Sequence, residues 1–268
     1  MVEPGQVRVE GSQASGLDPD QLSQFSRLLL LPDFDEVNLL SLCQKRVLIV
    51  GVGGLGAPVA LYLAQAGLRA MRLIDPDTVS LTNLPRQVLF SPEDLGRHKA
   101  EVVAQTLRQL APRLQVEAHI EYATSENLSP WVAGADLVLD CTDQFSVRQE
   151  INRSCIRLGK PLVSASALQW SGQLLVVDPN QPEAGCYACL FDPGNPPKEA
   201  ACGAYGVFST AVGTMGLLQA NEALKILLGK KPSAGALRVF DAKEPRLETL
   251  RFSARPGCPV CQSRHPVG

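Results

Sequence analysis

The stretch Arg46-Val-Leu-Ile-Val-Gly-Val-Gly-Gly-Leu-Gly56 decides the fold class of this chain. Its first five residues form an apolar, largely β-branched run that predicts a buried strand. Glycines follow at positions 51, 53, 54 and 56, and a helical pattern then runs from Ala57 to Ala66, just before Gly67. A strand, a glycine turn and a helix in this order are typical of the first unit of a nucleotide-binding α/β fold.

The same alternation of strand and helix recurs along the chain. We expect strands over 70–75, 115–120, 135–140 and 161–165, and helices over 21–31, 38–44, 99–110 and 147–158. Alternation of this kind predicts a Rossmann-like, doubly wound, mostly parallel sheet with helices on both of its faces.

The last third of the chain has a different texture. Residues 172–178 are strand-like, residues 179–203 are rich in Pro, Gly and Cys and should be irregular, and residues 209–228 suit a long apolar helix. The segments 237–240 and 248–252 suit two antiparallel strands. The predicted fold class is therefore α/β, with a mostly parallel sheet that continues into an antiparallel C-terminal extension.

Composition sets the broad class. The chain has 268 residues, 45% of them hydrophobic, and a formal net charge of −2. No apolar run reaches the ~20 residues that a membrane span needs, and residues 1–20 lack the apolar core of a secretory signal. We expect a cytoplasmic protein that binds neither membrane nor nucleic acid. Its eight cysteines then point to metal binding or chemistry rather than to disulfides.

The glycine turn and the acid after the second expected strand indicate a nucleotide site. Gly53 and Gly54 would let a ligand approach the backbone, and the start of the following helix offers free N–H groups to phosphate. Asp75 would accept hydrogen bonds from ribose hydroxyls. The structural alternative is that these glycines serve only tight packing of helix against strand.

Further polar residues favour ATP over a nicotinamide cofactor. Asn83, Arg86 and Gln87 lie just beyond Asp75, while Lys99 begins a helix and Asp143 follows a strand. A parallel sheet brings the carboxyl ends of its strands to one edge, so these groups should converge. Arg86 and Lys99 would neutralise a triphosphate, and Asp143 would hold Mg²⁺. Taken singly, each residue could instead be a solvated surface residue or a helix cap.

Two cysteine pairs indicate a structural metal site. Cys186-x-x-Cys189 and Cys258-x-x-Cys261 can each place two thiolates on one turn. Four thiolates give the closed tetrahedral coordination of structural Zn²⁺, which would clip the C-terminal tail to the middle of the chain. Two disulfides and a thioredoxin-like redox motif are the alternatives.

Together these motifs resemble those of the MoeB/ThiF/HesA family, relatives of ubiquitin-activating enzymes, over roughly residues 22–262. The resemblance is carried by Phe25-Ser-Arg27, Val50-Gly-Val-Gly-Gly-Leu-Gly56, Ile74-Asp-Pro-Asp-Thr-Val-Ser-Leu-Thr-Asn83, Arg86-Gln87, Gly96-Arg-His-Lys99, Asp140-Cys-Thr-Asp143 and the two Cys-x-x-Cys pairs. Motif order and spacing agree with the family as well.

The resemblance implies an ATP-dependent adenylyltransferase. Such an enzyme joins AMP to the C-terminal glycine carboxylate of a small β-grasp, ubiquitin-like sulfur-carrier protein ending in Gly-Gly, and releases pyrophosphate. It implies that ATP is bound by Gly53, Gly54, Asp75, Asn83, Arg86, Gln87 and Lys99. Asp143 would bind Mg²⁺, and the catalytic set would be Arg27, Arg86, Lys99 and Asp143. Arg27 matches an arginine that reaches into the partner subunit's site, which implies a homodimer.

The resemblance also frames the chain's organisation. Residues 1–20 are expected to form a flexible arm and residues 21–268 one adenylation domain. Its nucleotide-binding part would span about 45–165, and its carrier-binding and zinc part about 166–262. No rhodanese-like domain follows Cys261, so the sulfur donor is expected to be a separate cysteine desulfurase or rhodanese.

The role of Cys202 stays open in this comparison. It matches a cysteine that some relatives use for acyl or sulfur transfer and that others keep without depending on it, and it lies at a helix entrance that favours thiolate. The carrier is open too, because molybdopterin, thiamine and secondary-metabolite pathways all use such enzymes.

Three alternatives are weighed against this interpretation. A nicotinamide-dependent oxidoreductase would explain the glycine turn but not Arg86, Lys99, Asp143 or the cysteine pairs. A non-catalytic binding module would have no reason to keep the charged set. Adenylation of another acyl substrate, such as a peptide or a modified tRNA base, is the nearest rival.

Overall fold

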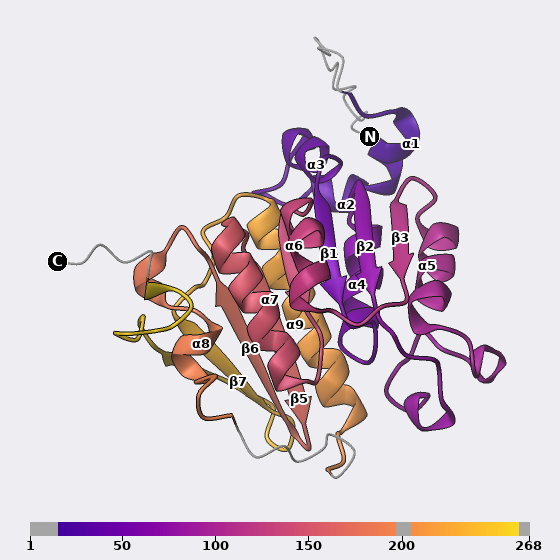
Figure 1. The fold of residues 1–268 in the computed structure, drawn as a ribbon. Helices are drawn as coiled ribbons and strands as arrows, with labels where there is room; N and C mark the ends of the chain where they lie inside the picture. The colour runs from indigo at the N-terminus through magenta and orange to yellow at the C-terminus, as the bar shows by residue number, and fades with distance from the viewer. Residues whose placement is uncertain (1–15, 197–204, 263–268) are drawn as a thin grey trace.

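The computed structural model describes residues 16–196 and 205–262. They form one eight-stranded sheet with the strand order β3-β2-β1-β4-β5-β6-β7-β8. The first five strands pair in parallel, and β6, β7 and β8 continue the sheet antiparallel to their neighbours. The predicted mostly parallel sheet with an antiparallel extension is therefore confirmed (Figure 1).

The strands match the expected segments closely. They are β1 Arg46–Val50, β2 Ala70–Ile74, β3 Gln115–His119, β4 Leu137–Asp140, β5 Leu162–Leu168, β6 Ser171–Val177, β7 Ala236–Asp241 and β8 Arg246–Arg251. Apolar residues follow one another without interruption in the central strands because both faces are buried. Val47 and Ile49 of β1 face one core, while Leu48 and Val50 face the other.

The helices cover the two faces of the sheet. They are α1 Pro19–Gln24, α2 Ser26–Leu29, α3 Glu36–Leu42, α4 Gly56–Gln65, α5 Lys99–Leu110, α6 Ser125–Ala133, α7 Phe145–Leu158, α8 Tyr187–Leu190 and α9 Ser209–Leu227. Three short 3₁₀ turns lie at Leu81–Asn83, Pro92–Asp94 and Pro182–Ala184. The core that contains α4, α5 and α9 lies on one face, and the core that contains α6, α7 and α8 lies on the other (Figure 1).

The structure corrects three expectations. The helix expected over 21–31 is broken into α1 and α2 at Phe25. Helix α6 was not predicted, because Pro130 inside it and Gly134 at its end weaken the helical signal. The signal available was its capping box, in which Thr124 and Asn127 bond reciprocally. The segment 179–203, expected to be irregular, contains α8 and a 3₁₀ turn.

Two expectations fall largely or wholly outside the described residues: most of the predicted arm over 1–20, and Cys202. Among the helices that are described, none combines the length and the apolar character needed to cross a bilayer.

Candidate nucleotide site and metal centre

The glycine turn follows the carboxyl end of β1, and α4 begins at Gly56, the last glycine of the turn. Gly51 has φ +85°, which favours glycine. A Cβ on Gly56 would lie 1.9 Å from the Gly51 carbonyl oxygen, and one on Gly54 would lie 2.5 Å from Val212 Cγ1. Gly53 differs, because a Cβ there would meet only the amide end of Gln87, at 3.1 Å. Packing thus requires Gly54 and Gly56, whereas Gly53 leaves the backbone open beside Gln87.

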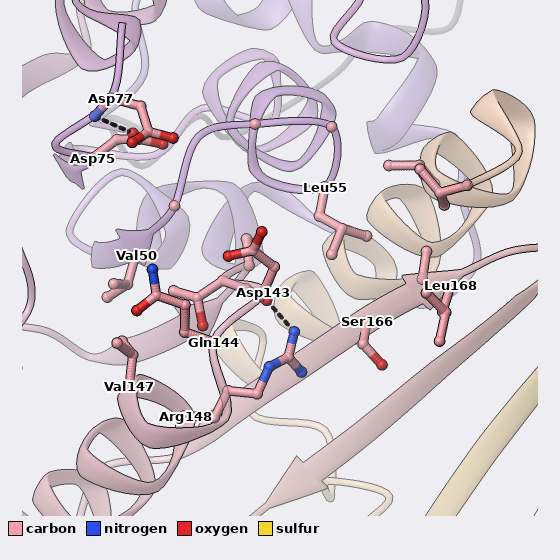
Figure 2. A pocket seen from close by; sticks show the side chains of 18 of the residues that line it. Val50, Leu55, Asp75, Asp77, Asp143, Gln144, Val147, Arg148, Ser166 and Leu168 are labelled. Atoms are coloured by element: carbon pink, nitrogen blue, oxygen red, sulfur yellow. Dashed lines mark hydrogen bonds between the residues drawn. The ribbon is translucent and has the colours of Figure 1, made fainter. Parts of the chain in front are cut away.

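A cavity of about 710 Å³ opens beside this turn. Of the sequence-predicted site residues, it brings together Gly53, Gly54, Asp75, Arg86, Gln87, Lys99 and Asp143. They come from the loops after β1, β2 and β4 and from the start of α5, so they share the carboxyl edge of the parallel strands. Figure 2 labels two of them, Asp75 and Asp143, at this edge. That is the edge at which ligands bind in open α/β sheets.

Asp75 ties the glycine turn to the loop after β2. Its Oδ2 accepts a hydrogen bond from Val52 N at 2.8 Å, and its Oδ1 accepts one from Asp77 N at 2.9 Å. Burial raises the pKa of Asp75, although the two amide donors and the charge of Lys99 oppose that rise. The carboxylate therefore lies in a weakly solvated place where a further donor, such as a hydroxyl, would be well bound.

Lys99 is a buried cation that lines the cavity. Its side chain is 7% exposed, and its Nζ lies 2.8 Å from Oδ2 of Asp77, whose own side chain is 60% exposed. Lys99 is the first residue of α5, where backbone N–H groups add positive potential. A buried ammonium that faces one half-exposed acid is well suited to receive an anion from the cavity.

The loop over 80–87 presents Arg86 and Gln87 to the cavity. Arg86 donates a hydrogen bond from its Nη1 to the Thr82 carbonyl at 2.8 Å. Gln87 is buried, and its Oε1 has no hydrogen-bond partner within the described part of the chain. An orphaned buried amide oxygen next to Gly53 marks a position that a ligand donor could satisfy.

Asn83 supports this loop instead of lining the cavity. Its Oδ1 accepts from Ser80 N at 3.1 Å, and its carbonyl accepts from the amides of Arg86 and Gln87, each at 3.0 Å. We expected Asn83 to contact the ligand together with Arg86 and Gln87. In the structure Asn83 forms hydrogen bonds within the loop that carries these two residues and is not among the residues that line the cavity.

Asp143 is exposed on the loop after β4 and lines the cavity. The loop is anchored by Asp140, which is 1% exposed and accepts from Thr142 N at 3.0 Å and from Thr142 Oγ1 at 2.7 Å. Ser164 Oγ donates to the other oxygen of Asp140 at 2.6 Å. This network fixes the backbone immediately before Asp143.

Arg148, on α7, also anchors the loop after β4, and this residue was not predicted from the sequence. Its guanidinium donates to the Thr142 carbonyl and, at 3.0 Å, to the Ala165 carbonyl, and its Nη1 lies 3.9 Å from Asp140 Oδ2 (Figure 2). Arg148 is 7% exposed. The signal available was an arginine on the first turn of α7, the helix that follows the strand-end acid Asp140, because a buried cation needs nearby partners.

Arg27 does not join the cavity of its own chain. It is exposed on α2. Phe25, two residues earlier, packs against Gly67, which precedes β2. This places α2 near the strand ends that lie away from the cavity (Figure 1).

The four predicted cysteines converge on one point. Their Sγ atoms all lie within 4.8 Å of one another. The Sγ–Sγ distances are 4.0 Å for Cys186–Cys189, 3.8 Å for Cys186–Cys258 and 3.5 Å for Cys189–Cys261. A disulfide would need about 2.05 Å, whereas a tetrahedron of sulfurs around a zinc ion has edges of about 3.8 Å. The cluster thus has the dimensions of a metal centre.

The surroundings of the cluster suit metal-bound thiolates. Arg255 N donates to Cys189 Sγ at 3.3 Å, and Asn152 Nδ2 donates to Cys186 Sγ at 3.5 Å. A hydrogen bond with Cys189, together with burial, raises the pKa of Cys186, and burial raises the pKa of Cys261. Four packed thiolates need a cation to stay ionised together, so the donor set fits a bound metal ion.

The comparisons with known proteins agree on one family. The profile described as the ThiF family matches residues 25–260. The Sulfur carrier protein ThiS adenylyltransferase of Escherichia coli (strain K12) is 47% identical over 238 residues, covering 89% of this chain and 94% of that protein. The Adenylyltransferase and sulfurtransferase MOCS3 of Drosophila sechellia is 40% identical over 258 residues, covering 95% of this chain and 56% of that protein. The chain thus spans about half the length of this second relative.

Among solved structures, E. coli MccB crystallised with ATP superposes with a TM-score of 0.76 at 24% identity, covering 89% of this chain and 73% of that chain. At this level of identity, the likeness shows a shared fold.

Proposed function

The chain belongs to the ThiF family, and from that premise we propose that it is an ATP-dependent adenylyltransferase. Its substrate would be a small ubiquitin-like sulfur-carrier protein, which it activates at the C-terminal glycine carboxylate. The product is an acyl-adenylate, and pyrophosphate leaves. Of the two named relatives, one is an adenylyltransferase of the sulfur carrier protein ThiS, and the other is an adenylyltransferase and sulfurtransferase.

One observation carries the proposal: Arg86, Lys99, Asp143 and the open backbone of Gly53 share a single cavity at the edge where α/β sheets bind ligands. A hydride-transfer site has no use for Arg86, Lys99 and Asp143 together. A triphosphate has a use for each of them, because its charge must be neutralised while one phosphoryl group reacts.

The reaction needs position and charge more than a protein nucleophile. A carboxylate is a poor acyl donor because oxide would have to leave. When a carboxylate oxygen attacks the α-phosphorus, the bond to pyrophosphate breaks and the acyl group acquires AMP as a good leaving group. The start of α4 and Gly53 would bind phosphate, and Asp75 would bind the ribose. Arg86 and Lys99 would stabilise the charge that grows on the phosphate oxygens.

Asp143 would hold Mg²⁺ beside these phosphates, since it is an exposed carboxylate at the cavity edge. The ion would supply further neutralisation of phosphate charge. Asp140 and Arg148, by fixing the Thr142 backbone, would keep Asp143 in place.

A homodimer would complete the site. Arg27 is exposed and remote from its own cavity, and Leu30, Leu31 and Val37 near it are exposed by 73%, 52% and 70%. A surface with large apolar side chains beside a cation suits contact with a second copy. Arg27 would then reach the partner's cavity.

The four-cysteine centre would hold Zn²⁺ in a closed, structural role, because four thiolates leave no open coordination position. Cys202 lies outside the described residues, and whether it takes part in acyl or sulfur transfer stays open. The sulfur donor would be a separate cysteine desulfurase or rhodanese. A reducing cytoplasm would suit the free thiols of the cluster.

The test is exchange of labelled pyrophosphate into ATP with purified chain and a carrier ending in Gly-Gly. Exchange should require both the carrier and its terminal glycine, and a carrier lacking that glycine is the matched control. Carriers of the ThiS type and of the type served by MOCS3 should be compared side by side. No exchange with any carrier, together with tight NADH binding, would favour the oxidoreductase.

A further inference from the structure

Helix α9 lies against both halves of the nucleotide site. It packs on α4, which continues the glycine turn, and on β4 and β5, which lead to and flank the loop that carries Asp143. Val212, Gly216 and Gln219 follow one another at about one helical turn, so they share one side of α9. The adenylation chemistry gives this helix no part of its own, although its contacts reach the groups that would hold the nucleotide.

The first half of α9 is seated on the backbone of the glycine turn. A Cβ on Gly54 would lie 2.5 Å from Val212 Cγ1. A Cβ on Gly216 would lie 2.8 Å from the Leu55 carbonyl oxygen and 2.8 Å from Pro58 Cγ. A side chain at either glycine would push the helix and the turn apart, so the position of the turn is set by α9.

Gln219 fixes the other half of the site from the same side of α9. It is fully buried. Its Nε2 donates to the carbonyls of Asp140 and Val163, each at 2.9 Å, and its Oε1 accepts from Cys141 Sγ at 3.2 Å. Both the nitrogen and the oxygen of the amide are therefore used, and two of their three partners lie at the end of β4, just before the Asp143 loop.

The two halves meet at Cys141, which Gln219 holds. A Cβ on Gly51 would lie 2.9 Å from the Cys141 carbonyl oxygen, and a Cβ on Gly56 would lie 3.3 Å from Cys141 Cβ. Cys141 N also donates to the Val50 carbonyl at 2.9 Å. Glycine turn and loop are thus in direct contact at the residue that Gln219 bonds, so this one amide controls how the two are spaced.

The same helix carries a second buried polar side chain that faces away from the cavity. Glu222 is 2% exposed, and its Oε1 lies 2.8 Å from Lys225 Nζ and 2.8 Å from Arg238 Nη1. Arg238 belongs to β7, so Glu222 ties α9 to the antiparallel extension. Gln219 and Glu222 therefore form a matched pair, in which only Gln219 touches the nucleotide site.

We propose that Gln219 is a positioning residue, which holds the loop before Asp143 at a fixed distance from the glycine turn, with α9 as their common support. Reacting groups that are misplaced by about 1 Å can lose about 10²-fold in rate, so this spacing bears directly on the reaction. The inference rests on the proposed adenylation for its kinetic test but not for its structural test.

The structural test is hydrogen exchange of backbone amides in the full chain without nucleotide. Gln219→Met keeps the size of the side chain and removes its three hydrogen bonds. Amides over 141–145 should exchange about tenfold faster, because the loop loses its anchor on α9, while those of β7 should be unchanged. Glu222→Gln, the matched control, should speed exchange in β7 and leave residues 141–145 unchanged.

Both variants should lower the melting temperature by about 4 °C, so lost stability alone would not tell them apart. If Gln219→Met does not fold, Gln219→Asn takes its place. Asparagine keeps the amide, but its shorter side chain cannot reach all three partners, so the change in hydrogen exchange over 141–145 should have the same direction and be smaller.

The kinetic test is carrier-dependent pyrophosphate exchange well below both melting temperatures. Gln219→Met should lower kcat about thirtyfold with the KM for ATP changed less than twofold, because the glycine turn still binds the nucleotide while the loop is misplaced. Glu222→Gln should keep both values.

The outcomes separate the two proposals. If Gln219→Met leaves hydrogen exchange over 141–145 unchanged, or lowers kcat no more than Glu222→Gln does, the positioning role is wrong while the adenylation proposal stands. If the loop loses protection as expected but the unaltered chain exchanges pyrophosphate with no carrier, the anchoring by Gln219 stands and the adenylation proposal fails.

Discussion

The nucleotide cavity and the four-cysteine centre lie on one fold but are built in opposite ways. The cavity is open, and its groups are only partly satisfied: Lys99 faces one half-exposed acid, and Gln87 Oε1 lacks a partner among the described residues. The cysteine centre is closed: Cys186 and Cys258 are fully buried, their Sγ atoms lie 3.8 Å apart, and Cys186 Sγ also accepts from the Asn152 amide. A site that must take up and release a ligand leaves polar capacity free, whereas a structural centre uses all of it.

The two sites also differ in how far apart along the chain their residues lie. The cavity gathers loops that follow neighbouring parallel strands, so the fold itself brings them together. The cysteine centre joins residues 186–189 to residues 258–261, across α9 and two strands. A metal bound by the four cysteines would therefore help to hold the antiparallel extension, while the cavity depends on the sheet alone.

The largest effect is expected from a substitution that damages the nucleotide cavity and leaves the four-cysteine centre intact. Asp143→Asn should lower carrier-dependent pyrophosphate exchange about 10³-fold, because the proposed magnesium ligand is lost while the loop keeps its anchors. Zinc content and melting temperature should be unchanged. The exposed Asp20→Asn on α1 is the matched carboxylate control, and near-normal exchange by Asp143→Asn would count against the site.

The second largest effect is expected from a substitution in the four-cysteine centre. Cys258→Ser should release the metal and lower the free energy of unfolding by about 3 kcal/mol or more, because metal binding here is folding energy. Hydrogen exchange should show β7 and β8 losing protection before β1 and β2 do. The control is Cys43→Ser, at a half-buried cysteine outside the cluster, which should keep both its metal and its stability. Equal loss of protection in all four strands would contradict the proposal that the metal holds the C-terminal strands.

A smaller effect tests whether the cavity is complete within one chain. Arg27→Ala and Asp143→Asn should each be inactive alone. Mixed after unfolding and refolding in equal amounts, they should regain about a quarter of the activity of the unaltered chain, because half of a random dimer population is mixed and each mixed dimer has one intact site of its two. No recovery, with mixed dimers verified by mass, would place Arg27 outside the partner's site.

The smallest effect concerns the charge that faces Lys99 in the free cavity. Asp77→Asn removes the carboxylate 2.8 Å from Lys99 Nζ, so the triphosphate would lose its nearest competitor for the ammonium. The KM for ATP should fall about threefold at low salt, with kcat little changed. A rise in KM would show instead that Asp77 takes part in binding.

Much of the fold could be predicted because local pattern and global fold agree. The turn over 51–56 and the start of α5 at Lys99 are set by residues next to one another in sequence. Helix α6 was missed because Pro130 contradicts its local pattern, and only tertiary packing of residues such as Leu128 and Trp131 overrides it. The break at Phe25 likewise depends on packing against Gly67.

The candidate site divides in the same way. Gly53, Asp75, Lys99 and Asp143 follow strands or begin helices, so sequence order alone predicts that they converge. Asn83 shows the limit, since its chemistry fits a ligand contact but its side chain caps the loop. Arg148 was missed because its hydrogen bond to the Ala165 carbonyl depends on a position that only the folded chain defines.

The most direct test of the account is a crystal structure of the chain with ATP and Mg²⁺. We predict the triphosphate against Gly53 and the start of α4, with Arg86 and Lys99 in contact with its oxygens and Asp143 coordinating the ion. An empty cavity at saturating nucleotide, or a triphosphate bound with both cations turned away, would contradict the account.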